Sequence, residues 1–481
     1  MPTYSEAAIT FTTDFQIGDV ITLISTTNIY VTEFVSSRSG AGEVTVGTPT
    51  ATAGERTAIN YEAAFDLDNA TGYITTQTTN TVTIQSEDID ETFIAIVSAT
   101  ENAGTFTVSF NNYEAPIDTT NVGLALVRSP HYVSTSFALI TTTKVTISLY
   151  VWSGDLDDIP ASPTFVQTRL RPIIDAVTLD TNLSELIRSN LNPTPNIVTT
   201  DPSQVIDSNT DAVKWIHYVA EFTDPRADIA DVVGTFSALD GFGYYNQNAN
   251  PTKPTNRILV SNLGNKKIAT NGLILIPFVN DGTYTSVDVD TETGDINENF
   301  VITTDLDNAK FVQYVCIDPS QTTDRLVTVT FNGDTDVVLT INLVDECRYN
   351  PKTIVFKNKY GAYETLSMFK KSTSTIEVKK DEFVNQFVTN LSYDTSRHQF
   401  RNINIEATEK ISLNTGYISE SENESYKQMM LSDQVWFWED GDLIPVNVVK
   451  NSLEFKTRVN DKLVNYTMEF KYSYNTIQNV W

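Results

Sequence analysis

Residues 326–341 read LVTVTFNGDTDVVLTI, and this stretch shows most clearly how the chain folds. Apolar side chains alternate with Thr in residues 326–331, and a second apolar run follows in residues 337–341. Between them lies Asn332-Gly333, a dipeptide that tight hairpin turns prefer. Alternation with a period of two places the apolar side chains on one face of a strand. The stretch therefore predicts an antiparallel β-hairpin with one buried face.

The same pattern recurs along most of the chain. In the first half its cleanest example is residues 144–152, KVTISLYVW, which end at the turn sequence Ser153-Gly154-Asp155. Regular turns between short strands favour sandwiches or barrels over a parallel sheet with crossover helices. We therefore predict a mainly β protein with several antiparallel β-sandwich or barrel-like domains and a few short helices.

Three short helices are expected among the strands. Residues 57–66 and 183–188 have apolar side chains at helical offsets, with Thr57 and Asn60 as cap candidates for the first. The third is expected after Ser421, because Ser421 and Glu424 have the spacing of a capping box and apolar side chains follow at helical offsets.

The length of the chain predicts several domains, because 481 residues exceed what one hydrophobic core supports. The order of strands and turns suggests four segments. They are an N-terminal β domain with one short helix (1–115), two β domains (116–236 and 237–349), and a C-terminal β module with one helix that is a candidate docking module (350–481).

Charge is distributed unevenly between these segments. Residues 1–350 carry 16 basic and 44 acidic side chains, a net of −28, whereas residues 351–481 carry 16 and 17, a net of −1. An acidic surface repels nucleic acid, and the pairs Lys370-Lys371 and Lys379-Lys380 are too short to form a basic patch. We expect no nucleic-acid partner, solvated lysines on strands or turns, and a nearly neutral C-terminal module that docks.

The two cysteines, Cys316 and Cys347, lie in strand-like runs and cannot form a disulfide framework. We expect folding in a reducing compartment, and whether the two thiols pair is left open. The N-terminus lacks the features of a signal peptide, and no apolar run approaches the roughly 18 residues of a membrane span. Neither secretion by the general route nor membrane insertion is expected.

Catalytic motifs are missing from the sequence. Only His131, His217 and His398 could act as the usual general base, and no Gly-x-Ser-x-Gly, His-Glu-x-x-His or phosphate-binding Gly-rich loop occurs. Close carboxylate pairs follow from 61 acidic residues alone, so they do not indicate glycan cleavage. We expect no enzymatic activity, no catalytic residues and no cofactor.

The weak metal candidates are Asp288, Asp290 and Glu292, whose alternating carboxylates could offer oxygen ligands to Ca²⁺. Gly294 comes one position too late for an EF-hand loop, and no helices flank it. A solvated hairpin end is the favoured interpretation, and we predict no metal site.

Three tryptophans are interface candidates. Trp436 and Trp438 flank Phe437, so both indoles should project from one face of a strand and Phe437 from the other. Aromatic side chains anchor interfaces and cores alike. Trp481 is the third candidate, because an indole at a chain end suggests packing on a neighbour.

A set of motifs carries a resemblance to a known family. They are Arg128-Ser129-Pro130-His131-Tyr132, residues 149–154, Pro160-Ala161-Ser162-Pro163, Trp215, Asp240-Gly241-Phe242-Gly243-Tyr244, Asn358-Lys359-Tyr360-Gly361-Ala362, residues 369–372, residues 413–417 and residues 461–466. This order, over residues 120–481, resembles virion structural proteins of tailed phages that infect Bacteroidetes bacteria.

The resemblance implies a tail or baseplate component that assembles as a symmetric oligomer. Its partners would be copies of itself and other virion proteins, and it would reach the virion after synthesis in the host bacterial cytoplasm. It implies no catalytic residues.

Two alternatives remain at this point. The first is a receptor-binding tail protein that recognises a host surface glycan through aromatic platforms such as Tyr244-Tyr245 or Trp152. The second is a capsid decoration or collar protein, which would have the same composition. Position in the virion and copy number are left open.

Overall fold

The chain is a multi-domain, mainly β protein with few short helices, as the sequence predicts, and its open sheets are mainly antiparallel, with a few parallel strand pairs. Its structure is a computed structural model. The residues that it describes are 6–11, 20–25, 29–35, 43–45, 58, 61, 73–86, 93–98, 106–111, 123–136, 143–170, 178–197, 201–223, 227–229, 231–251, 254–305, 307–385, 388–389, 391–393, 395–449 and 465–477. Within these ranges, no helix has the length and hydrophobicity needed to cross a membrane.

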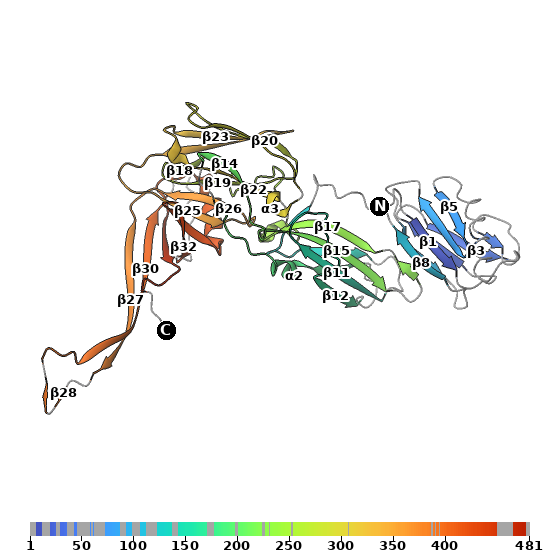
Figure 1. Cartoon of the computed structure of the whole chain (residues 1–481), viewed down its shortest axis with the longest axis horizontal. Coiled ribbons are helices and arrows are strands. Elements are labelled where there is room, and N and C mark those ends of the chain that lie inside the picture. Colours follow the sequence, from blue (N-terminus) through green and yellow to red (C-terminus); the bar gives the residue numbers. More distant parts are fainter. Residues whose placement is uncertain are drawn as a thin grey trace.

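Two sheets contain the N-terminal strands (Figure 1). The first has the order β5 (Tyr73–Thr78), β6 (Thr81–Ser86), β1 (Glu6–Phe11) and β8 (Phe106–Asn111). The second has the order β16 (Ala227–Ile229), β7 (Phe93–Ser98), β2 (Val20–Ser25), β3 (Ile29–Val35) and β4 (Glu43–Thr45). Of the predicted helix at 57–66, only Ala58 and Tyr61 are described, and both are helical and buried.

The next region is built on a five-stranded sheet. Its order is β12 (Phe165–Leu170), β11 (Lys144–Trp152), β15 (Val213–Thr223), β17 (Val232–Leu239) and β9 (Gly123–Leu126). A small sheet of β10 (Tyr132–Ser136) and β13 (Thr178–Asn182) leads into helix α2 (Ser184–Arg188). Apolar side chains from both sheets and α2 form one core, since strand alternation and the helix turn them inward.

The third region packs two sheets face to face. One has the order β14 (Ser203–Asp207), β22 (Val312–Ile317) and β19 (Ile274–Val279); the other has β18 (Lys266–Ala269), β24 (Val337–Val344), β23 (Leu326–Gly333), β20 (Tyr284–Thr291) and β21 (Asn297–Val301). Phe278 and Phe331 meet edge to face at 5.3 Å in the core between them. The predicted hairpin of residues 326–341 is confirmed as β23–β24. Helix α3 (Asn308–Phe311) and the 3-10 turn η2 (Pro319–Gln321) flank β22.

A seven-stranded sheet organises the C-terminal region. Its order is β26 (Tyr363–Met368), β25 (Lys352–Lys357), β31 (Val435–Glu439), β32 (Asp442–Val448), β33 (Thr467–Tyr472), β30 (Phe400–Asn414) and β27 (Thr373–Val384). Helix α4 (Asn423–Leu431) packs on this sheet. The expected capping box lies two residues earlier than predicted: Ser419 and Glu422 form it and start the 3-10 turn η3 (Glu420–Glu422), which leads into α4.

Two strands hydrogen-bond outside the segment that their position in the sequence suggests. β16 belongs to the loop between β15 and β17, yet it pairs with β7 of an N-terminal sheet. β14 precedes β15 in the chain but pairs with β22. A further core combines residues of the second, third and C-terminal regions, from Leu124 to Tyr363. The four domain limits therefore stay a prediction, while the regions from β9 onward share an interior.

Candidate assembly surface and the junction that supports it

Three of the sequence motifs converge where the second region meets the C-terminal sheet. The backbone N–H of Phe242 donates to the carbonyl oxygen of Lys359 at 2.6 Å, and that of Arg128 donates to the carbonyl oxygen of Gly241 at 2.8 Å. Residues 128, 241 and 359 are thus brought together from three distant parts of the chain. We call this contact the junction.

Two glycines allow the backbones to approach so closely. A Cβ added at Gly241 would lie 2.6 Å from the carbonyl carbon of Tyr360, and one at Gly361 would lie 2.8 Å from that of Asp240. Gly361 also has a φ of +81°, in the left-handed region that favours glycine. Backbone atoms cannot move aside as a flexible side chain can, so these positions require glycine.

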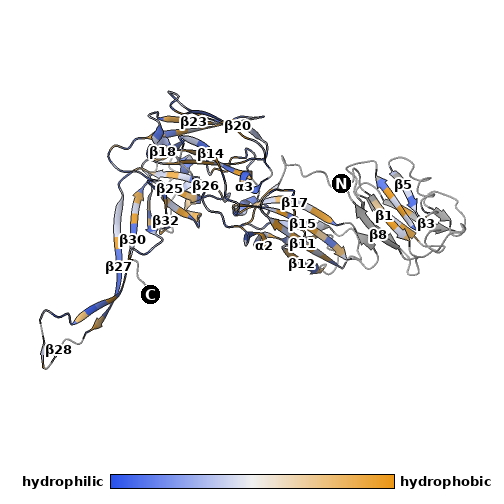
Figure 2. Cartoon of the chain, viewed as in Figure 1, coloured by the Kyte–Doolittle hydropathy of each residue, from blue (hydrophilic) through white to orange (hydrophobic). Residues whose placement is uncertain are grey.

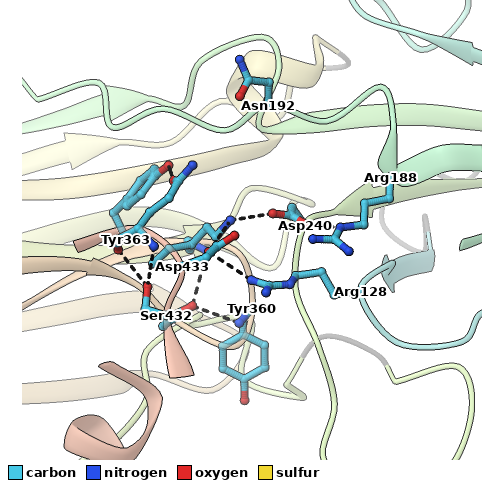
Figure 3. Close-up of polar contacts among 12 residues, drawn as sticks. Arg128, Arg188, Asn192, Asp240, Tyr360, Tyr363, Ser432 and Asp433 are labelled. Atoms are coloured by element: carbon cyan, nitrogen blue, oxygen red, sulfur yellow. Dashed lines mark hydrogen bonds and ion pairs between the residues drawn. The ribbon is translucent and has the colours of Figure 1, made fainter. Parts of the chain in front are cut away.

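Charged side chains form a network across the junction, with the buried pair Lys357 and Asp240 at its centre (Figure 3). Lys357, at the end of β25, is 2% exposed, and its Nζ lies 2.5 Å from Asp240 Oδ2 and 3.0 Å from Asp433 Oδ1. Arg128 Nη1 lies 3.1 Å from Asp433 Oδ1, and Arg188 Nε lies 3.4 Å from Asp240 Oδ1. Each buried charge therefore has an opposite charge beside it, which a dry interior requires.

Asp433 has its pKa below the ordinary value. Burial alone would raise the pKa, but the hydrogen bond from Lys357 and the charges of Lys357 and Arg128 together outweigh that effect. The ionised form of Asp433 is thus the one that the junction stabilises.

A second buried carboxylate fixes the same sheet from its other side. Glu364 on β26 is fully buried, and it accepts hydrogen bonds at 2.8 Å from both the backbone N–H and the Oγ of Ser261. The Nζ of Lys266, on β18, forms an ion pair with it. The C-terminal sheet is therefore held to both the second and the third regions through satisfied polar contacts.

From this sheet projects a long hairpin, residues 373–405, which we call the arm (Figure 1). β27 and β30 form its strands, and β28 (Val388–Thr389) pairs with β29 (Ser392–Tyr393) near its tip. Every residue of β27 is exposed, and β30 becomes half-buried only from Glu406 onward. At about 3.3 Å per residue, the 12 residues of β27 span roughly 40 Å.

Two stretches of the arm, β27 and residues 400–403 of β30, have an outer edge without a neighbour among the described strands. β27 pairs with β30 alone, and β30 pairs with β33 between Lys410 and Asn414; beyond β33, the backbone N–H of Thr476 donates to the carbonyl oxygen of Ala407 at 2.9 Å. An isolated two-stranded hairpin is marginally stable in water, and free strand edges are sites for pairing with another chain. The arm is therefore the part of the described chain whose structure is least complete without a partner.

Hydrophobic residues alternate with hydrophilic ones along the arm (Figure 2). The exposed apolar side chains of the arm are Ile376, Val378, Phe383, Val384, Val388, Leu391, Phe400, Ile403 and Ile405. Exposed apolar side chains gathered on one hairpin mark interaction sites more often than scattered single residues do.

A bulge divides the arm. The register shifts between Lys379, opposite Glu406, and Asp381, opposite Ile403. Asn404 has a φ of +49° at this position, and its Nδ2 donates to Asp381 Oδ2 at 3.0 Å. Asparagine tolerates the left-handed region better than most residues, so Asn404 suits the backbone conformation that the bulge requires.

The arm shares the neutrality of the C-terminal region and differs in charge from the first 350 residues. Residues 373–405 carry four basic and four acidic side chains, whereas residues 1–350 have a net charge of −28. Residues 395–405, on the returning strand, contain two arginines and no acidic residue. The arm can therefore approach an acidic surface without like-charge repulsion.

The weak metal candidates do not converge. Asp288 accepts hydrogen bonds from the side-chain amides of Asn299 and Asn332, whereas Asp290 and Glu292 are exposed. In the part of the chain that the structure describes, no three His, Cys, Asp or Glu side chains are grouped so that they could hold a metal ion.

Two of the three tryptophan candidates lie within the described residues. Trp436 and Trp438 are half-buried against the shared core, and Phe437 is buried on the other face of β31, as alternation predicts. Trp436 meets Tyr363 edge to face at 5.7 Å. Trp481 lies outside the described residues.

The three histidines lie in different surroundings. The ring of His131 packs 4.7 Å from that of Phe236, and burial lowers its pKa. His217 Nδ1 shares a 2.9 Å hydrogen bond with Thr235 Oγ1, and His398 is exposed on the arm. The histidines are not brought together.

Cys316 and Cys347 do not form a disulfide, and they differ in exposure. Cys316 is buried in β22, where burial and the nearby Asp318 raise its pKa to about 12, whereas Cys347 is exposed beyond β24. Cys316 is thus protected from reagents that reach Cys347.

The proposed aromatic platforms are unequal. Trp152 is buried and donates its Nε1–H to the carbonyl oxygen of Asp155 at 2.9 Å. The hydroxyl of Tyr244 donates to Glu424 at 2.6 Å, and Lys427 Nζ lies 3.7 Å from the centre of its ring. Tyr245 is fully exposed, at the start of the 3-10 turn η1 (Tyr245–Gln247).

Comparison with known proteins does not assign the chain to a family. No protein-family model matches it, and no curated protein matches it. A solved structure from work on host cell surface retention of a 1.5-MDa bacterial ice-binding adhesin aligns over 71% of this chain and 91% of that one, at 9% identity and a TM-score of 0.13. A TM-score this low supports no argument about fold or function.

Proposed function

We propose that this chain is a non-enzymatic structural component of a phage virion, a tail or baseplate protein that assembles as a symmetric oligomer. The observation that supports the proposal best is the arm: an exposed, net-neutral hairpin with several exposed apolar side chains, on a chain whose first 350 residues are strongly acidic. An arm of this kind gains stability and buries its apolar residues when it lies against another subunit. The motif resemblance to virion structural proteins is the reason for proposing a virion as the assembly.

The junction adds support to a structural role. Buried ion pairs and close glycine contacts give the arm a rigid base, because they fix the C-terminal sheet against two other regions. The acidic N-terminal and middle regions would then face outward and limit aggregation before assembly.

The arm can be removed without disturbing the sheet. Lys379 and Glu406 are opposite each other, so Asn-Gly in place of residues 380–405 would close a two-residue turn. Far-UV circular dichroism and melting should match the full chain, while light scattering and incorporation into gradient-purified particles should show loss of assembly. Full incorporation of the arm-less chain would contradict the proposal.

This deletion is a better test than removal of residues 351–481. Val355, Ala362 and Tyr363 contribute to the shared core, so a chain ending at residue 350 would lose folding together with docking. Immunogold labelling of intact particles with antibody fragments against residues 1–115 then locates the protein: label on the head would favour the decoration or collar alternative.

Tyr245 favours one second candidate, a receptor-binding role toward a host glycan. A fully exposed tyrosine ring offers a stacking surface, which Trp152 does not. A glycan array with the full chain and with Tyr245→Ala tests it, and saturable binding that the substitution removes would establish this role.

A further inference from the structure

We propose that the arm docks on a second copy of this chain, where the returning strand β30 adds to the edge strand β21 of the third region. This inference rests on the proposed structural function and names the partner of the arm. Charge, strand length and reach support it.

Charge is complementary between the two edges. Residues 288–307, which contain β21 and part of β20, carry seven acidic and no basic side chains. The returning strand of the arm carries Arg401 on an exposed part of β30. Opposite charges of this kind steer the approach of two surfaces and select their register.

The two strand edges are also similar in length. β21 is five residues long and hydrogen-bonds to β20 alone among the described strands, and its Val301 is 76% exposed. Residues 400–403 of β30 lie between the tip of the arm and the bulge, beyond β33 and the contact of Thr476 with Ala407, and Phe400 and Ile403 are exposed. Antiparallel pairing of these segments would form about four backbone hydrogen bonds and cover apolar surface on both.

The arm cannot reach β21 of its own chain. Figure 1 shows β20 at the top of the molecule, whereas the arm leaves the C-terminal sheet in the opposite direction and ends at β28. The acceptor must therefore belong to another copy. Because the arm and β21 are different surfaces, the contact is heterologous, and it generates a closed ring or a helical stack.

Cross-linking of two full-length variants tests the contact. With Cys347→Ser as background, Asn402→Cys is mixed with Asn299→Cys and treated with a short bismaleimide, while Cys316 stays buried and unreactive. A covalent dimer that forms in the mixture, and not with either variant alone, is the expected result. Since both substituted residues are exposed, folding should be unaffected.

A charge swap provides the second measurement. Arg401→Glu should weaken self-association at least tenfold in sedimentation experiments, and addition of Glu298→Lys should restore most of it. Assembly of the wild-type chain without the mixed cross-link, and without an effect of Arg401→Glu, would overturn this inference but leave the proposed function intact. A wild-type chain that stays monomeric at every concentration and does not enter particles would overturn both.

Discussion

The junction and the arm use the same kinds of residue in opposite ways. At the junction, Lys357 is 2% exposed and contacts two carboxylates, and two glycines bring backbones into contact. On the arm, all of β27 is exposed, and Leu391 near the tip is fully exposed. The first region pairs its charged groups within one chain, and the second leaves outer strand edges and apolar side chains for a partner. Stability should depend on the junction and assembly on the arm.

The largest effect is expected when a lysine is replaced by methionine at the junction, and the same substitution on the arm serves as the control. Lys357→Met leaves Asp240 and Asp433 without their shared amine, and breaking a buried ion pair in this way costs about 3–5 kcal/mol. The substitution should lower the free energy of local opening at β25 and β17, and hydrogen exchange of their backbone amides measures it. A local measurement is needed because a chain with several regions does not unfold in one step. Lys380→Met, at an exposed position on the arm, is the matched control and should leave these rates unchanged.

Glycine substitutions should have the next largest effect. Gly361→Ala places a Cβ in the left-handed region and 2.8 Å from a carbonyl carbon, so we expect a loss of about 2–3 kcal/mol. Gly441→Ala has a similar φ of +93° but nothing within 4 Å, so it measures the backbone strain alone, about 1 kcal/mol. Equal melting shifts for the two variants would mean that the close contact at the junction contributes nothing.

Acidification should weaken the junction by a smaller amount, since Asp433 is partly exposed. Its pKa is lower in the folded chain than in the unfolded chain, so the stabilisation is complete above the unfolded value, near 4, and is lost as the pH falls through the folded value. Hydrogen exchange at β25, corrected for the intrinsic pH dependence, should therefore accelerate below about pH 4. Asp433→Asn should remove this acid-dependent step, and its persistence in that variant would assign the step to another group.

The smallest effect is expected on the arm itself. Val384 and Phe400 are cross-strand partners at the distal end, and such pairs contribute about 0.2–1 kcal/mol. Phe400→Ala should speed hydrogen exchange in the distal part of the arm and leave the melting temperature of the protein unchanged. A lower melting temperature would show that the arm stabilises the rest of the fold, and would contradict the expectation that stability depends on the junction.

Local sequence patterns predicted the strands well, because alternation and turn dipeptides act within a few residues. β11 coincides with residues 144–152, and the hairpin of residues 326–341 forms as expected, although Asn332 and Gly333 extend β23 and the turn lies at residues 334–336. The capping box was misplaced because Ser419 and Ser421 both precede a glutamate by three residues, and only the fold selects Ser419. The junction could not be predicted, since it joins residues more than 100 positions apart.

The arm was missed for a different reason. In TSTIEVKKDEFV, residues 373–384, neither alternate set is wholly apolar, and this is the signal for a strand that buries no face. That signal marks an exposed strand and not one that projects, because whether a strand leaves the body depends on which neighbours it finds. The acidic candidates Asp288 and Asp290, considered first as metal ligands, lie on the strand next to the proposed acceptor edge.

The pairing of β16 with β7 sets an order of events during synthesis. β7 ends at Ser98 and β16 begins at Ala227. The ribosome therefore synthesises β16, the edge partner of β7, about 130 residues after β7. At roughly 5–20 residues per second, that delay is about 7–26 seconds. During this interval the nascent N-terminal sheet has an open edge that could pair with another nascent chain, and chaperone binding would have its greatest benefit at that stage.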